Sequence, residues 1–432
     1  MNLVKRLAYM ISRSFFVGER LRWRPVSLFV FAAFIFMSAP VVAQVSVKSL
    51  RCEMLENPIG IDVAQPRLSW QIEGTERGIE QNAYQIIVAS SPEKLTENDA
   101  DLWNSGRTGS EVSQLQKYLG EKLRDNAKAY WKVKVWTNKG ESAWSEMARW
   151  SVGLLYYKSW NGRWIGFDRY FPSDHADESS LSARYFRKEF SAEKEIKSAT
   201  AYIMGLGLYE LYIDGKKVGN QVLAPSPTDY TQNIKYNAFD VTDMIGEGQH
   251  AIGVILGSGR FYAMRQAKPY KVKSFGFPKM LMQINIVYTD GSSQIIKTDN
   301  SWKGTADGPI IASNEYDGEQ YDARKEFGDW AKSGFDDQQW LTAEYVQEPG
   351  GAYQAQMNPY MKVMQDLRVK NIVSIGNGKY VLDFGQNFSG WVKMRVRGSS
   401  GKAVTLRFAE SLQEDGTLFV ENLRDAKATD TY

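Results

Sequence analysis

Hydrophobic and polar residues alternate with a period of two along most of the chain after about residue 45. This period is typical of β-strands that bury one face. The clearest example is 130–137, where Trp131, Val133 and Val135 alternate with lysines. One short helix is expected at 93–103, whose first turn is acidic as the helix dipole prefers, and no run of paired amphipathic helices is present. The pattern therefore predicts an all-β protein.

The expected strands fall into successive blocks, which we interpret as tandem β-sandwiches. We expect a fibronectin type III-like domain at 44–153, a linker at 154–180, an antiparallel jelly-roll domain at 181–346 and a truncated, incomplete β-sandwich at 347–432. Asp214-Gly215 is expected to form a type I′ hairpin turn. The strands are expected at 67–72, 84–89, 130–137, 147–152, 184–190, 199–204, 208–213, 235–239, 251–256, 280–289, 294–297, 361–375, 379–384, 391–397 and 402–408.

A targeting segment precedes these blocks. Basic residues up to Arg24 are followed by an apolar run at 26–37, and Val41-Val42-Ala43 offers a small-residue cleavage site. We expect 1–43 to be a signal peptide, so that the protein is exported to the periplasm or secreted and meets a membrane only through this signal. An uncleaved anchor is the alternative, because the apolar stretch is nearly long enough to span a bilayer. Pro40 favours cleavage.

Composition excludes several classes of function. The net charge is +3 and no basic tract is interleaved with aromatic residues, so we expect no nucleic-acid partner. Cys52 is the single cysteine, which rules out an intrachain disulfide. His175 and His250 stand far apart without a supporting motif, which argues against a zinc site or a Ser/His/Asp site. The 13 Trp and 23 Tyr suit both β-sandwich cores and sugar-stacking surfaces.

Two loops of the jelly-roll block form a candidate carbohydrate-binding site. One loop, 224–230, is stiffened by prolines, and the other, 257–262, contains two glycines that allow a sharp bend or the close approach of a ligand. No Gly-Lys-Ser/Thr follows, so a phosphate-binding loop is rejected. If the cluster is only structural, its aromatic rings will pack inward. The candidates are Asn220, Asp229, Tyr230, Arg260, Phe261 and Tyr262.

An acidic stretch at 314–324 is a candidate calcium site. Calcium takes six to eight oxygen ligands from loops of irregular geometry, and Glu315, Asp317, Glu319 and Asp322 supply carboxylates within a short span. The spacing differs from the helix-loop-helix calcium motif, and a solvated loop is the commoner outcome. Asp322 with Arg324, two residues on, is a further alternative as a structural ion pair.

Trp160 and Trp164 in the linker allow two interpretations. Two tryptophans four residues apart can form a platform for a sugar ring, or they can pin the linker between the flanking sandwiches. We favour the second interpretation.

Several motifs resemble the N-terminal β-sandwich region of bacterial α-L-rhamnosidases, a glycoside hydrolase family. They are GLGLYELYIDGKKVG at 205–219, LAPSPTDY at 223–230, LGSGRFYAMR at 256–265, NEYDGEQYDARKE at 314–326 and VLDFGQNFSGWV at 381–392. In that family a helical (α/α)6 barrel with the catalytic carboxylates follows these domains, and some members bind sugar through calcium. The last block resembles the family's concanavalin-like domain, cut short at Tyr432.

The resemblance implies that the chain is the N-terminal portion of an exported enzyme that removes terminal α-L-rhamnose by inversion. The native partner would then be the missing C-terminal barrel, the ligand a rhamnose-containing glycan, and Ca²⁺ the one cofactor to consider. We assign no catalytic residue and expect the isolated chain to be inactive. The alternative is a stand-alone, non-catalytic carbohydrate-binding protein. A structural adhesin lacks the expected tandem repeats.

Overall fold

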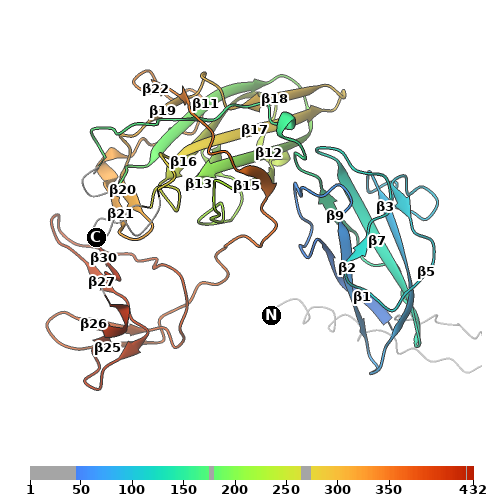
Figure 1. Cartoon of the computed structure of the whole chain (residues 1–432). Helices are drawn as coiled ribbons and strands as arrows, with labels where there is room; N and C mark the ends of the chain where they lie inside the picture. Colours follow the sequence, from blue (N-terminus) through green and yellow to red (C-terminus); the bar gives the residue numbers. More distant parts are fainter. Residues whose placement is uncertain (1–44, 175–179, 264–273, 425) are drawn as a thin grey trace, which may run out of the picture. The chain divides into compact units, whose positions relative to one another are not determined.

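The computed structural model describes residues 45–174, 180–263, 274–424 and 426–432, and strands dominate them (Figure 1). The expected all-β class of tandem β-sandwiches is confirmed. The predicted signal peptide and His175 lie outside the described residues. Within the described part, no helix has the length and apolar character needed to cross a membrane. Its helical turns are the 3-10 segments η1 (Tyr157–Ser159), η3 (Thr242–Met244), η5 (Ala323–Lys325) and η6 (Glu421–Leu423).

The first block folds into two sheets around one core. The central strand β7 buries every second residue, and the rings of Trp131 and Trp150 lie in the interior with Trp70. One sheet has the order β1-β2-β6, and in the other β3 and β7 pair over most of their length. The strands are β1 (Val45–Cys52), β2 (Arg67–Gly74), β3 (Gln81–Ala89), β4 (Trp103–Asn104), β5 (Thr108–Gly109), β6 (Gln116–Lys117), β7 (Lys128–Thr137), β8 (Gly140–Glu141) and β9 (Ala148–Ser151).

The short helix expected at 93–103 is wrong. The segment consists of turns, in which the hydroxyl of Thr96 donates to Asp99 at 2.7 Å and accepts the backbone N–H of Asp99 at 3.2 Å. The hydroxyl of Thr96 thus binds the backbone N–H of Asp99, which a helix would have used for its own hydrogen bond. Asp99, within the segment expected to be helical, stabilises one of these turns instead.

The second block is a two-layer jelly roll. Apolar side chains from both sheets, including Phe186, Ile203, Val254, Met282 and Trp302, meet in its largest core. One sheet runs β23-β10-β17-β12-β15-β24 with β18 beside β17, and the other β14-β13-β16-β11-β19-β22 (Figure 1). The first sheet contains β10 (Ile165–Gly166), β12 (Ile196–Leu206), β15 (Asn233–Asp240), β17 (Lys279–Tyr288), β18 (Ser293–Lys297), β23 (Glu344–Tyr345) and β24 (Ala352–Ala355). The second contains β11 (Arg184–Ala192), β13 (Leu208–Ile213), β14 (Lys216–Lys217), β16 (Gly248–Gly257), β19 (Lys303–Thr305) and β22 (Leu341–Thr342).

Two details of this jelly roll bear on the sequence predictions. The Asp214-Gly215 turn has positive φ angles of 48° and 77° and joins β13 to β14, as predicted. Strands within 181–346 pair antiparallel with one another wherever the structure describes a pair, as expected, and β24, from the next predicted block, pairs with β15 in parallel at one edge. β24 reaches that edge after a long connection through 241–351, and a connection of this length permits a parallel pairing.

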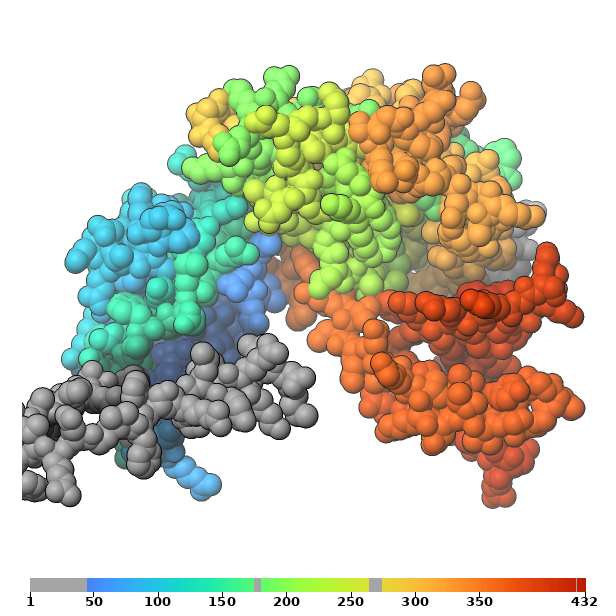
Figure 2. All heavy atoms as spheres, turned by 180° about the vertical axis from the view of Figure 1, so that it is seen from behind, coloured from blue at the N-terminus to red at the C-terminus, as the bar shows by residue number. Residues whose placement is uncertain are grey.

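The segment after residue 361 carries small, separate two-stranded sheets. The pairs are β25 (Asn371–Ser374) with β26 (Tyr380–Asp383), β27 (Thr405–Arg407) with β30 (Thr429–Thr431), and β28 (Ser411–Leu412) with β29 (Leu418–Phe419). These residues are orange to red in Figure 2, and Trp391 among them is 63% exposed. The strand expected at 391–397 is absent, because no described strand hydrogen-bonds to it. Apolar side chains of this alternating pattern, Trp391 and Val396 among them, are therefore exposed.

Candidate functional site

The aromatic members of the predicted sugar site point into the protein. Tyr230, Phe261 and Tyr262 are 1%, 0% and 3% exposed. The ring of Tyr230 packs edge-on against Phe261, with centroids 5.2 Å apart, and the hydroxyl of Tyr262 lies 2.9 Å from that of Tyr170. Burial first, and the charge of Glu315 second, raises the pKa of Tyr230 to about 12. None of the three rings offers a free face to a sugar, and this inward packing marks their role as structural.

The polar members of that site do not converge. Arg260 interacts with Glu315, at 3.4 Å, and with the hydroxyl of Tyr316. Asp229 closes its own turn by accepting the hydroxyl of Thr231 at 2.6 Å and its N–H at 3.1 Å. Asn220 is exposed on the loop after β14. The structure brings Arg260 to the acidic stretch instead of to a sugar-stacking ring.

The predicted calcium ligands are likewise dispersed. Asp322 caps η5 and forms an ion pair with Arg324 at 2.7 Å, which is the structural alternative that the spacing allowed. The hydrogen bonds of Arg324 lower the pKa of Asp322 to about 2. Glu315 faces Arg260, and Glu319 lies on β21 (Gly318–Tyr321), which pairs with β20 (Ile310–Asn314). Among the described residues no group of three metal-ligating side chains comes together. The four carboxylates therefore do not form a common calcium site.

Glu319 has a shifted pKa although it is exposed on β21. Burial, followed by the charge of Glu210, raises its pKa. A general acid in glycoside hydrolysis needs such a shift and a second carboxylate that remains free to act on water. Glu210 accepts a hydrogen bond from Tyr212 and pairs with Lys217, so its carboxylate is already engaged. We assign this pair no catalytic role.

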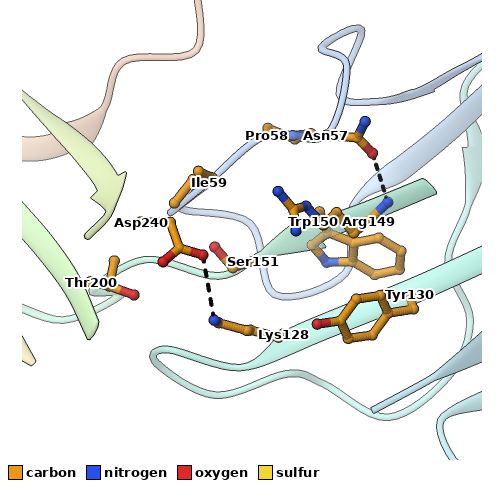
Figure 3. Close-up of a pocket in the computed structure, with 10 residues that line it drawn as sticks. All are labelled: Asn57, Pro58, Ile59, Lys128, Tyr130, Arg149, Trp150, Ser151, Thr200 and Asp240. Carbon is orange, nitrogen blue, oxygen red and sulfur yellow. Dashed lines mark hydrogen bonds and ion pairs between the residues drawn. The ribbon is translucent and has the colours of Figure 1, made fainter. Parts of the chain in front are cut away.

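A small polar hollow is lined by residues of the first block and by Thr200 and Asp240 of the jelly roll (Figure 3). Lys128 Nζ lies 3.7 Å from the Asp240 carboxylate, and the backbone N–H of Arg149 donates to Asn57 at 2.8 Å. The hollow has a volume of about 30 Å³. That space accommodates roughly two water molecules and is too small for a sugar ring.

Trp160 and Trp164 are buried, with 8% and 5% exposure. They belong to a hydrophobic cluster formed with side chains of β12, β15 and β17. The indole of Trp160 packs edge-on against Tyr202 and Tyr236 at centroid distances of 6.4 and 5.5 Å. The rings thus anchor the linker, and this supports the packing interpretation over an exposed sugar platform.

A larger hollow, of about 210 Å³, was missed by the sequence analysis. Its walls come from 157–164 and 346–353, together with Leu281 of β17. The carboxylate of Glu348 accepts hydrogen bonds from the hydroxyls of Tyr157, at 3.0 Å, and Tyr353, at 2.6 Å. The aromatic residues around Trp160 were the only sign of this hollow in the local sequence. Their partners Glu348 and Tyr353 lie about 190 residues further along the chain.

The folds of these blocks define a multidomain β-sandwich protein with a central jelly roll. Three family models match it, described as "Rha78A-like, N-terminal immunoglobulin domain" at 47–156, "Alpha-L-rhamnosidase N-terminal domain" at 194–365 and "Bacterial alpha-L-rhamnosidase concanavalin-like domain" at 373–432. The chain belongs to the bacterial α-L-rhamnosidase family and carries its N-terminal β-domains.

Named relatives support this assignment. An α-L-rhamnosidase of Formosa agariphila is 35% identical over 83% of this chain, and one of Alteromonas sp. (strain LOR) is 33% identical over 87%. The matches cover 40% and 41% of those relatives. The solved α-L-rhamnosidases of Dictyoglumus thermophilum (39% identity, TM-score 0.77) and Aspergillus terreus (33%, TM-score 0.79) each match 90% of this chain and 44% of their own. The chain spans less than half the length of these relatives.

Proposed function

We propose that this chain is the N-terminal portion of an exported α-L-rhamnosidase. In this proposal the whole protein hydrolyses terminal α-L-rhamnose from glycosides with inversion, and the β-domains support a catalytic barrel supplied by the remaining length. The observation that carries the proposal is the match of nearly the whole described chain to the first part of proteins named α-L-rhamnosidase. A further solved relative, from Streptomyces avermitilis, is complexed with L-rhamnose and is 25% identical over 90% of this chain.

Inversion requires a carboxylic acid and a carboxylate about 6.5–9.5 Å apart, with a water molecule between the base and the sugar. The described residues hold no helix longer than a 3-10 turn, whereas the resemblance places these carboxylates in a helical barrel. The proposal therefore gives the chain a supporting role in catalysis and assigns the chemistry to the barrel.

A chimera tests this role. In the chimera, this chain replaces the matching 40% of the Formosa agariphila relative. The substrate is 4-nitrophenyl α-L-rhamnoside, and the release of nitrophenol measures the rate. NMR identifies the anomer of rhamnose that forms first. We expect the chimera to be active and to release the inverted β-anomer, and the chain alone to be inactive. The remainder of the relative without any N-terminal part is the control.

Two results would contradict the supporting role. One is a folded chimera without activity. The other is hydrolysis by the chain alone that disappears when one of its own acidic side chains is replaced. A folded but inactive chimera together with sugar binding by the chain would favour the stand-alone carbohydrate-binding alternative.

Export rests on the basic and apolar pattern of the first residues. We expect the protein recovered from the periplasm or medium of a bacterial host to begin near Gln44 when its N-terminus is sequenced. Recovery of a chain that starts at Met1 from the membrane fraction would instead show the uncleaved anchor.

A further inference from the structure

The hollow between 157–164 and 346–353 has the size and lining of a site for one sugar ring. Its volume is about 210 Å³, which is below the roughly 300–1,000 Å³ of sites for drug-sized ligands. The side chains that matter for recognition are Tyr157, Arg163 and Glu348, and the buried rings of Trp160 and Trp164 form the base of the hollow with Tyr353.

The base of the hollow is rigid and aromatic. Trp164 donates its indole N–H to the hydroxyl of Tyr353 at 2.7 Å, and the ring of Trp160 packs edge-on to Tyr353 with centroids 5.9 Å apart. The ring centroid of Tyr157 lies 5.2 Å from that of Tyr353, and Tyr157 is 67% exposed. The exposed ring of Tyr157, supported by this base, can bind a ligand without a large loss of side-chain freedom.

The hydrogen bonds at Glu348 have a fixed direction. The pKa of Tyr157 is raised mainly by its hydrogen bond to Glu348 and then by burial. The pKa of Tyr353 is raised mainly by burial and then by its own hydrogen bond to Glu348. Both hydroxyls therefore remain protonated at neutral pH and donate to the same carboxylate oxygen, Oε2. Within the described residues no hydrogen bond or ion pair engages Oε1 of Glu348, so this oxygen is available to accept one from a ligand.

Arg163 supplies the complementary donors. Its guanidinium stacks on the ring of Tyr345 with 3.7 Å between the central carbon and the ring centroid. Its backbone N–H bonds to Thr298, while its side chain makes no hydrogen bond to any residue that the structure describes. The hollow therefore combines unused donors, one unused acceptor and an exposed aromatic face.

We propose that this hollow binds a neutral pyranose ring of a glycan, with the C–H face of the sugar on Tyr157 and its hydroxyls shared between Glu348 and Arg163. A cationic ligand would meet the guanidinium of Arg163, and an anionic ligand would meet the carboxylate of Glu348. Vicinal hydroxyls donate to one group and accept from the other, so a neutral polyol satisfies both. The site is separate from the loops at 224–230 and 257–262.

The use of a rhamnoside as the first test ligand rests on the proposed function, whereas the site itself does not. The purified chain is titrated with methyl α-L-rhamnopyranoside, and in parallel with D-glucose and D-galactose, by saturation-transfer NMR and tryptophan fluorescence. We expect saturable binding to at least one sugar, with a dissociation constant of about 1 mM. Tyr157→Ala and Glu348→Gln should each weaken it by about tenfold or more. Added EDTA should leave it unchanged.

Matched controls are available beside each variant. Tyr156 is 60% exposed and adjacent to Tyr157, and Glu344 pairs with Arg169 at the surface. Tyr156→Ala and Glu344→Gln are therefore expected to bind like the parent chain. The proposal is overturned if the folded chain binds none of the three sugars, if the Tyr157 and Glu348 variants bind as the parent does, or if EDTA abolishes binding. None of these results depends on whether the chimera hydrolyses its substrate.

Discussion

Replacing Asp174 by alanine should destabilise the jelly roll by about 3–5 kcal/mol, because it leaves the charge of Arg184 buried and unpaired. Both side chains are fully buried. The guanidinium makes two parallel bonds of 2.8 Å to the carboxylate, and its Nε has no partner within the described residues. Asp174 also accepts the N–H groups of Phe171, at 2.7 Å, and Ser182, at 2.9 Å.

The same pair should give the jelly roll an acid-labile contribution to stability. Burial by itself would raise the pKa of Asp174, but the hydrogen bonds and charge of Arg184 and the N–H groups of Phe171 and Ser182 lower it overall. A lowered folded-state pKa contributes stability above the unfolded value of about 3.9, and that contribution is lost as the pH falls through the folded pKa. The difference between the parent and Asp174→Ala should therefore shrink below about pH 4.

Urea unfolding followed by circular dichroism at pH 7 and at lower pH measures both effects. Asp290→Ala, which removes an exposed partner of Lys194, is the matched control and should change stability little. Adding Arg184→Met to Asp174→Ala should recover part of the loss, because it removes the unpaired charge. An Asp174→Ala protein as stable as the parent would show that the buried pair contributes nothing.

Strand positions were predictable where alternation coincides with a buried face. The strand expected at 208–213 is β13, and the one expected at 280–289 differs from β17 by one residue at each end. The pair Arg184 and Asp174 could not be read in this way. A period of two places residues on faces, but it does not say that a carboxylate from the preceding loop will reach a buried arginine.

The candidate sites were less predictable than the strands because loops carry no periodicity. Gly259 illustrates this: its φ is +46°, and a Cβ at this position would meet the backbone of Gly207 at 2.9 Å. Gly259 thus allows two segments of the chain to approach closely, whereas the sequence was equally consistent with the close approach of a ligand. The same close packing turns Tyr230 and Phe261 inward. The hollow beside Tyr157 needs two segments that only the folded sheet brings together.

Trp302→Ala is expected to cost about 3–5 kcal/mol, since it leaves a cavity in the largest core of the jelly roll. The ring is fully buried between the two sheets. Its indole N–H also donates to the carbonyl of Lys297 at 2.9 Å, so the substitution leaves that acceptor without its partner. The backbone carbonyl of Trp302 accepts the N–H of Ala343 at 2.9 Å, a bond that alanine can keep.

Two further tryptophans separate the contributions of ring volume and hydrogen bond. Trp302→Phe keeps most of the ring but loses the donor to Lys297, whereas Trp131→Phe in the first sandwich loses an indole N–H that has no partner among the described residues. Urea unfolding at 25 °C should therefore show the larger loss for Trp302→Phe. Trp391 is 63% exposed, and Trp391→Ala should leave the transition of the jelly roll unchanged. Equal stability of the Trp302→Ala and Trp391→Ala proteins would contradict the placement of Trp302 in the core.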